Sequence, residues 1–179
     1  MKPIRYLRDT TGAAAVEFAL TLALLMVPTM AVIDIGSYTY TKMQVDHAAQ
    51  VGAQYVWATC NTPSKLPVTK YCPITDANVL SAAQSATQLR SAVTAPASGT
   101  VLTEYYACLT SGAIVNQDTS QTYTMSNPIG PEASTCSSGH PMDYVTVTVN
   151  STYNPVFGGI SVASLLGTSL TKTSTIRVF

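Results

Sequence analysis

Four cysteines offer the clearest chemistry in the sequence, because two thiols can be oxidised to a disulfide. They are Cys60, Cys72, Cys108 and Cys136, and all follow a long apolar run near the N-terminus. An even number of cysteines beyond such a run is typical of two disulfides, although four cysteines allow three pairings. We expect Cys60–Cys72, which closes a short proline-rich loop, and Cys108–Cys136, which ties a predicted strand to a long excursion.

The side chains that could bind a metal or catalyse a reaction are poorly placed for either role. Zinc sites usually contain close ligand pairs such as C-x-x-C, whereas no two cysteines here are closer than 12 positions. His47 and His140 lie far apart. The sequence has no G-x-S-x-G nucleophile motif. We therefore expect a protein that is not an enzyme and that holds no metal or other cofactor.

The charge balance argues against nucleic acid as a partner. The net charge is +0 and only 10% of the residues are charged. Without its first 12 residues, the chain has six basic and eight acidic residues. This is not the basic footprint of a nucleic-acid-binding protein. A weakly charged composition rich in threonine, valine and tyrosine instead favours strands and an extracellular surface.

Glu17 is the one charged residue in the apolar run Ala13–Ile33, which is 21 residues long. A helix of roughly 20 apolar residues crosses the ~30 Å core of a bilayer. An ionisable group within such a helix is costly, so Glu17 is a candidate functional residue. Lys2, Arg5 and Arg8 precede the run, and basic residues mark the cytoplasmic side. We expect the N-terminus inside and the rest of the chain outside.

The helix is expected to continue past the membrane run as an amphipathic segment. Pro28 interrupts the apolar half and predicts a kink. Between Ser37 and Thr59, polar and apolar stripes recur at helical spacing. The polar stripe contains Lys42, Asp46, Gln50 and Gln54, and the apolar stripe contains Val45, Ala48, Gly52, Tyr55 and Val56. The small residues in and beside the apolar stripe would let another element approach closely.

The remaining chain predicts an α+β domain with a small antiparallel sheet. The expected elements are a loop over Cys60–Pro73, a helix from Ala77 to about Leu89 capped by Thr75 and Asp76, and strands over Thr100–Thr110, Asp143–Tyr153 and Ser169–Phe179. A long excursion, Ser111–Pro141, separates the first two strands and has one short strand near Tyr123. Because so small a sheet needs a cover for its apolar face, we expect the amphipathic half of the helix to pack on it.

Several motifs carry a resemblance to a known family. Gly12–Phe18 reads G-A-A-A-V-E-F, Ile33–Ser37 reads I-D-I-G-S, and Ala48–Gln54 reads A-A-Q-V-G-A-Q. The first resembles the processing site of type IV pilins and pseudopilins. Together they resemble TadE-like proteins, minor pseudopilins of the tight adherence (Flp, type IVb) pilus system. Tyr144–Val149 and the ending S-T-I-R-V-F are also similar to that family, whereas Cys60–Pro141 has no such likeness. The related TadF and TadG proteins share the opening motif.

The resemblance implies a leader, a membrane helix and a pilin-like domain. A prepilin peptidase would cut between Gly12 and Ala13 and remove residues 1–12. Residues 13–36 would then be the transmembrane and assembly helix, and residues 37–179 the periplasmic α+β domain. Cleavage would create an α-amino group on Ala13, which needs an anion in an apolar bundle. Glu17 of an adjacent subunit, followed by Phe18, could supply it.

The resemblance also implies a function and partners. The protein would be a structural or assembly component of a tight adherence pilus, which supports adhesion, surface colonisation and biofilm formation. Its partners would be the prepilin peptidase, other pilins and pseudopilins, and the inner-membrane assembly platform. It would reside in the inner membrane, or in the extracellular pilus after assembly. The alternative is a permanently anchored periplasmic ligand-binding or adhesin domain. A mature N-terminus at Ala13 favours the first interpretation and one at Met1 the second.

Overall fold

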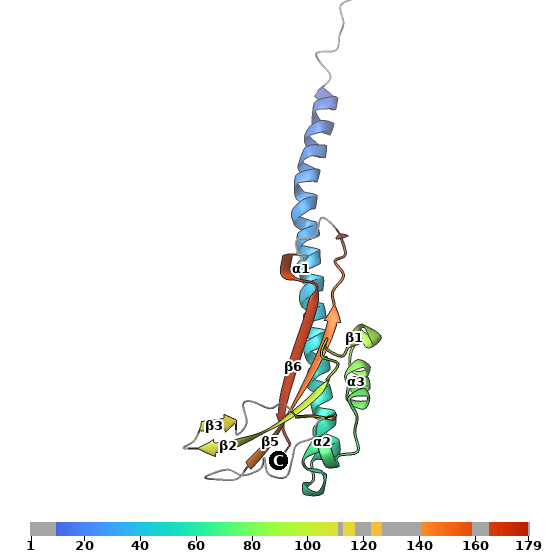
Figure 1. Ribbon diagram of the computed structural model, residues 1–179. Coiled ribbons are helices and arrows are strands. Elements are labelled where there is room, and N and C mark those ends of the chain that lie inside the picture. The colour runs from blue at the N-terminus through green and yellow to red at the C-terminus, as the bar shows by residue number, and fades with distance from the viewer. Residues whose placement is uncertain (1–9, 111–112, 117–122, 127–140, 159–164, 179) are drawn as a thin grey trace, which may run out of the picture. The chain divides into compact units, whose positions relative to one another are not determined.

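The computed structural model describes residues 10–110, 113–116, 123–126, 141–158 and 165–178. It has the predicted α+β fold, with one long N-terminal helix and a small antiparallel sheet (Figure 1). The chain divides into two compact units. The first comprises Met1–Thr39 together with Asn154–Gly167, and the second comprises Tyr40–Tyr153 together with Thr168–Phe179.

Helix α1 runs from Thr10 to Cys60 without interruption. Its first half is rich in alanine, leucine and methionine, which are strong helix formers. Its second half has the polar and apolar stripes that indicate an amphipathic helix. The predicted continuation of the membrane helix into an amphipathic one, as far as Thr59, is confirmed.

In the described part of the chain the sheet has six strands, all paired antiparallel. They are β1 (Val93–Thr94), β2 (Leu102–Thr110), β3 (Ala113–Asn116), β4 (Tyr123–Thr124), β5 (Pro141–Thr152) and β6 (Ser169–Arg177). The order is β1–β5–β2–β3, with β4 paired to β2 and β6 paired to β5. The three long strands, β2, β5 and β6, correspond to the three predicted from sequence.

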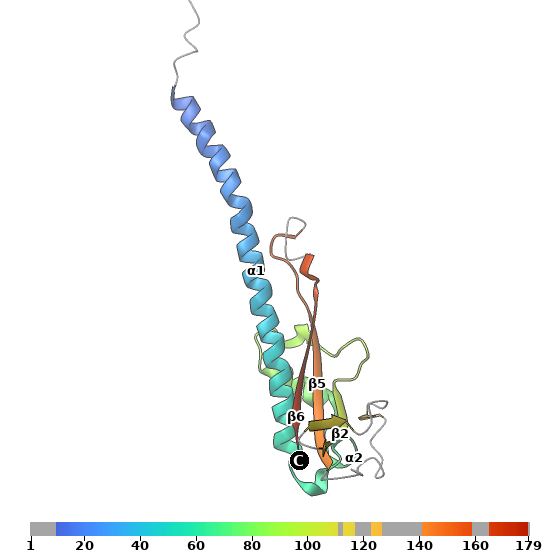
Figure 2. The same ribbon diagram turned by 90° about the vertical axis from the view of Figure 1, so that its left-hand side faces the viewer.

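The core of the second unit lies between α1 and one face of the sheet (Figure 2). Val145, Val147 and Val149 are 0% exposed and alternate along β5 with half-buried residues, as the period of a strand requires. The residues that α1 buries completely or almost completely there are Val45, Ala48, Ala49, Ala53 and Val56. The predicted apolar stripe is therefore confirmed, with Tyr55 only half-buried at its edge.

The segment Cys60–Pro73, predicted as a loop, contains two short helical turns, so that prediction is partly wrong. They are η2 (Pro63–Lys65) and α2 (Val68–Tyr71). Pro63 begins η2 and Pro67 immediately precedes α2. Proline is tolerated at such positions because the first N–H groups of a helix have no partner within it. Single turns of this length have no periodicity to reveal them.

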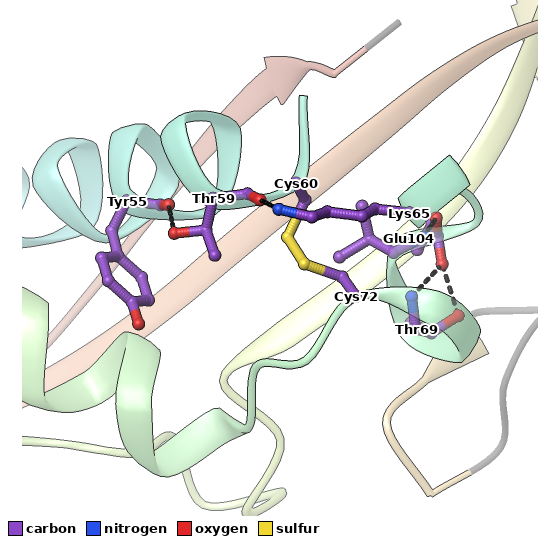
Figure 3. Close-up of a disulfide and its surroundings, with 8 residues drawn as sticks. Tyr55, Thr59, Cys60, Lys65, Thr69, Cys72 and Glu104 are labelled. Atoms are coloured by element: carbon purple, nitrogen blue, oxygen red, sulfur yellow. Dashed lines mark hydrogen bonds between the residues drawn. A yellow bond between two sulfur atoms is a disulfide. The ribbon is translucent and has the colours of Figure 1, made fainter. Parts of the chain in front are cut away.

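A disulfide between Cys60 and Cys72 joins the end of α1 to the residue that follows α2 (Figure 3). This confirms the first predicted pair. Cys108, in β2, is also disulfide-bonded and is buried. Its predicted partner, Cys136, lies outside the described residues, so the second pair remains a prediction.

Helix α3 (Asp76–Ser85) begins one residue before the predicted Ala77 and ends four residues before Leu89. The side chain of Thr75 caps it by accepting a hydrogen bond from the Asn78 N–H. At its other end the Gln84 amide donates to the Val93 carbonyl at 2.8 Å, which ties the last turn to β1. A 3-10 turn, η3 (Arg90–Ala92), follows. The sequence also missed β1 and β3, whereas the short strand expected near Tyr123 is present as β4.

Helix α1 approaches the sheet closely at Gly52. A Cβ at this position would lie 3.0 Å from Val147 Cγ1 and 3.5 Å from Val79 Cγ1. Both valines are fully buried, so neither has free space to move into. A glycine is therefore needed here for packing, and the small residues of the apolar stripe have the role that the sequence predicts.

We expect Gly52→Val to lower the free energy of unfolding by about 1–3 kcal/mol, because it overpacks the core. Gly36→Val is the matched control, since a Cβ at Gly36 of the same helix has nothing within 4 Å. Denaturant unfolding in mild detergent, followed by the fluorescence of Trp57, measures both. Equal stability of the two variants would contradict the close contact at Gly52.

Candidate membrane and assembly segment

The first part of α1 is apolar and exposed on all sides. Every residue from 12 to 29 is exposed, including Phe18 at 67% and Leu24 at 75%. Among the described residues, α1 is the one helix long and apolar enough to cross a membrane. Apolar surface left in water costs roughly 25 cal/mol per Å². This stretch therefore requires lipid or the apolar surface of other helices.

The predicted cleavage site lies in the first turn of the described helix. Gly12 and Ala13 are both exposed, and a Cβ at Gly12 would meet nothing within 4 Å. Most of the predicted leader, residues 1–9, lies outside the described residues. The structure thus places the proposed scissile bond on an accessible surface and leaves its cleavage a prediction.

Glu17 and Phe18 lie one turn further along, on the exposed surface of α1. The Thr21 hydroxyl donates to the carbonyl oxygens of both residues, at 2.9 Å each, and so hides its own polar group within the helix. No described residue forms an ion pair with the Glu17 carboxylate. A carboxylate without an ion-pair partner in the described part of its own chain is available to one in another chain.

Helix α1 continues through Pro28 without a break. Proline lacks the N–H that would bond to the carbonyl four residues earlier. The neighbouring Thr29 hydroxyl donates to the Leu25 carbonyl at 2.7 Å, which adds a bond in the turn that the proline weakens. Such side-chain bonds allow proline in membrane helices. The kink at Pro28 stays a prediction.

Asp34 is the functional candidate that the sequence did not single out. It is fully buried, although the residues on both sides of it in α1 are exposed. One oxygen of its carboxylate accepts a hydrogen bond from the Val156 N–H at 2.9 Å. The motif I-D-I-G-S drew attention to this turn, but its partner is 122 positions away in the sequence. Local periodicity gives no information about a contact of that range.

Comparison with known proteins gives one family match, which covers most of this helix. Residues 12–54 match a family model described as TadE-like protein. The chain carries a TadE-like segment. No curated protein and no solved structure matches the chain. The TadE-like segment begins at the predicted cleavage site, includes Glu17, Pro28 and Asp34, and ends on the small-residue face that packs against the sheet.

Outside the TadE-like segment, two acidic side chains are buried on the core face of the sheet. Glu104 in β2 is 0% exposed and Asp143 in β5 is 2% exposed. The Glu104 carboxylate accepts hydrogen bonds from the backbone N–H groups of Val68, at 2.6 Å, and Thr69, at 2.9 Å. It also accepts one from the Thr69 hydroxyl (Figure 3). Glu104 therefore fixes the first turn of α2 against the sheet through strong, charge-assisted bonds.

Asp143 is held in its neutral form by its surroundings. Burial, followed by the charge of Glu104 and a side-chain hydrogen bond with it, raises the pKa of Asp143 to about 9. At neutral pH the Asp143 carboxyl is therefore mostly protonated. Tyr106, opposite Asp143 in the β2–β5 pairing, also has a raised pKa, first from burial and then from the two carboxyls. Neither acid is marked as a site residue by the sequence pattern around it.

Because the pKa of Asp143 is raised beside Glu104, we expect the stability of the protein to depend on pH. A free aspartate titrates near pH 3.9. Between about pH 4 and 9, the folded state therefore binds more protons than the unfolded state. The contribution of protonated Asp143 to the free energy of unfolding is fully present below the pKa of the unfolded state. It is lost as the pH rises through the pKa of the folded state, and the free energy of unfolding falls by at most about 1.4 kcal/mol per pH unit.

Asp143→Asn should reduce this slope, because an amide keeps the shape of the side chain but does not titrate. We expect the variant to exceed the wild type in unfolding free energy at pH 8–9 and to approach it near pH 5, a window set by the raised Asp143 pKa. Denaturant titrations across that range provide the measurement. Parallel pH profiles for the two proteins would show that Asp143 does not titrate in this window.

Proposed function

We propose that this protein is a minor pilin or pseudopilin of a tight adherence (Flp, type IVb) pilus and has no enzymatic activity. The TadE-like segment supports the association with this pilus system. The observation that carries the proposal is the surface of α1, which is apolar and exposed on all sides from Gly12 to residue 29. A helix of this kind suits both a bilayer and a bundle of like helices, which are the two environments of a pilin.

The proposal includes a sequence of locations and partners. A prepilin peptidase would remove residues 1–12 on the cytoplasmic side. The apolar part of α1 would hold the protein in the inner membrane, with the sheet in the periplasm. Other pilins, pseudopilins and the assembly platform would then take the helix into or beneath the filament. Through that filament the protein would support adhesion, surface colonisation and biofilm formation.

Glu17 has a specific role in this proposal. Cleavage creates an α-amino group on Ala13, with a reference pKa of about 7.7–8.0. A cation within an apolar bundle is costly unless an anion lies beside it. Glu17 is exposed and has no ion-pair partner among the described residues, so the Glu17 of an adjacent subunit meets this need.

Gly12→Val should block processing, because the peptidase has to accommodate backbone without a side chain at the cut. We expect the wild type to lose the first 12 of its 179 residues and the variant to retain them. Gly36→Val is the matched control, since this glycine of the same helix is equally open. Intact mass and N-terminal sequencing of the membrane fraction provide the measurement.

The same experiment separates the two functions considered from the sequence. A wild-type chain that begins at Ala13 supports the pilin. One that keeps Met1 in cells with an active prepilin peptidase supports a permanently anchored periplasmic domain. A Gly12→Val chain that still begins at Ala13 would show that the cleavage motif has been misinterpreted.

Glu17→Gln should be expressed, inserted and cleaved normally, but should fail to assemble. In the bilayer the loss of an unpaired carboxylate costs nothing. In a bundle it leaves the Ala13 cation uncompensated, at a cost of about 3–5 kcal/mol. A photo-crosslinker at Leu20, which is 68% exposed, measures contact with other pilins, and sheared filaments measure incorporation.

Asp46→Asn is the control for the loss of a negative charge from α1, because Asp46 lies outside the apolar stretch and is only half-buried. It should crosslink and assemble as the wild type does. If cleaved Glu17→Gln protein joined filaments at the wild-type level, the pairing with Ala13 would be excluded. The pilin assignment would then rest on processing and co-purification alone.

A further inference from the structure

The connection between β5 and β6 is unusually apolar for a segment that joins two strands. Residues 154–167 include no charged residue. Three of its large aliphatic side chains are prominently exposed: Val156 at 60%, Leu165 at 84% and Leu166 at 54%. Connections are usually polar because they face water. An exposed apolar group of this size therefore indicates a contact with something other than water.

The connection packs against the apolar part of α1. Asn154–Gly167 and the helix up to Thr39 belong to one compact unit. Phe157 lines an apolar hollow with six residues of the helix, which are Leu22, Leu25, Met26, Thr29, Met30 and Ile33. All six lie within the run Ala13–Ile33 that is long enough to cross a bilayer. The surface of the connection is therefore continuous with the surface of the membrane helix.

Two backbone groups of the connection form hydrogen bonds with side chains of the helix. The buried Asp34 carboxylate accepts the Val156 N–H. One turn later, the Tyr38 hydroxyl donates to the Leu166 carbonyl at 3.5 Å. Backbone groups at membrane depth need such partners, because lipid provides none. Tyrosine is also enriched where the hydrocarbon meets the headgroups.

The length of the run places this contact at a definite depth. At ~1.5 Å per residue, Ala13–Ile33 spans about 31 Å, which matches the thickness of a bilayer core. Ile33 then lies at one boundary of the hydrocarbon, and Asp34 lies just outside it. Phe157, against Ile33 and the turns before it, falls within the leaflet next to that boundary.

We propose that the described ends of the β5–β6 connection, residues 154–158 and 165–167, form a second membrane-contacting element. It inserts Val156, Phe157, Leu165 and Leu166 into the boundary between headgroups and acyl chains, beside the helix. Asp34 and Tyr38 hold its backbone in place there. The partner is the lipid bilayer itself, and the element would fix the depth and rotation of α1 in the membrane. Apolar side chains buried about 5–10 Å into this boundary are typical of interfacial anchors.

Tryptophan scanning in vesicles tests the proposal on the full chain. Trp57→Phe first removes the sole tryptophan. Single tryptophans are then introduced by Leu165→Trp and, as an independent second position, Phe157→Trp. Leu24→Trp is the reference for the membrane helix, and Thr171→Trp, at an exposed position of β6, is the reference for water. The vesicles contain phosphatidylethanolamine and phosphatidylglycerol, with tracer phosphatidylcholine brominated near the headgroup or near the chain end.

We expect bromine near the headgroup to quench Leu165→Trp and Phe157→Trp more strongly than bromine near the chain end. Both should emit at shorter wavelength than Thr171→Trp. Quenching and emission that match Thr171→Trp would overturn the proposal. A blue-shifted emission that bromine does not quench, and that weakens as protein is diluted in lipid, would assign the connection to a second copy of the chain and would also overturn it.

Leu24→Trp shows whether the helix is embedded in the vesicle membrane at all. If bromine did not quench this tryptophan either, the helix would not be embedded, and the proposal would fall with it. The vesicles contain no pilus component, so the outcome is independent of the proposed role in a tight adherence pilus. That role is tested by processing and assembly instead.

Discussion

Helix α1 must keep its apolar surface away from water in two different ways, and the rest of the structure depends on this requirement. From Gly12 to residue 29 every side of the helix is exposed, so its cover has to come from outside the chain. From Val45 to Val56 the apolar residues occupy one side, and the sheet covers them. One continuous helix thus joins a segment that needs other molecules to a segment that folds with its own chain.

Three buried acids determine which distant segments meet. A carboxylate buried without a partner is costly, and each acid avoids that cost differently. Asp34 accepts a backbone N–H from a segment 122 positions away. Glu104 accepts N–H groups from the first turn of α2, 35 and 36 positions away. Asp143 remains protonated beside Glu104. Apolar residues supply most of the burial, whereas Asp34 and Glu104 bind particular backbone N–H groups of distant segments.

The elements that the sequence predicted correctly are those with a long local pattern. The helix as far as Cys60 and the strands β2, β5 and β6 each have 9 or more residues at a clear period. The elements that it missed, among them α2, β1 and β3, have 2 to 4 residues. Elements so short are fixed by their partners: a proline and Glu104 hold α2, and pairing with longer strands holds β1 and β3.

The residues of the candidate site also differ in whether a local sequence pattern indicates them. Gly12, Glu17 and the apolar run are local features, so the sequence alone revealed them. Asp34 needed the structure, because nothing near it in the sequence indicates Val156. Glu104 gave a weaker signal, since it alternates with Leu102 and Cys108 on one face of a predicted strand. A glutamate in a strand is ordinarily assigned to the solvent side, and only the α2 donors explain its burial.

The two halves of α1 also differ in the surface that they leave open to another subunit. Between Val45 and Val56 the sheet already occupies the apolar side of the helix, so neighbouring helices have no access to it. The residues that face outward there are mainly polar, including His47, Gln50 and Gln54. Met43, at 65% exposed, and Trp57, at 45%, are apolar exceptions on either side of this stretch. The stretch of α1 whose apolar surface is open on all sides is therefore the one before Asp34, from residue 12 to residue 29. There, Phe157 of the β5–β6 connection already covers part of the helix surface that lipid or other helices would otherwise contact.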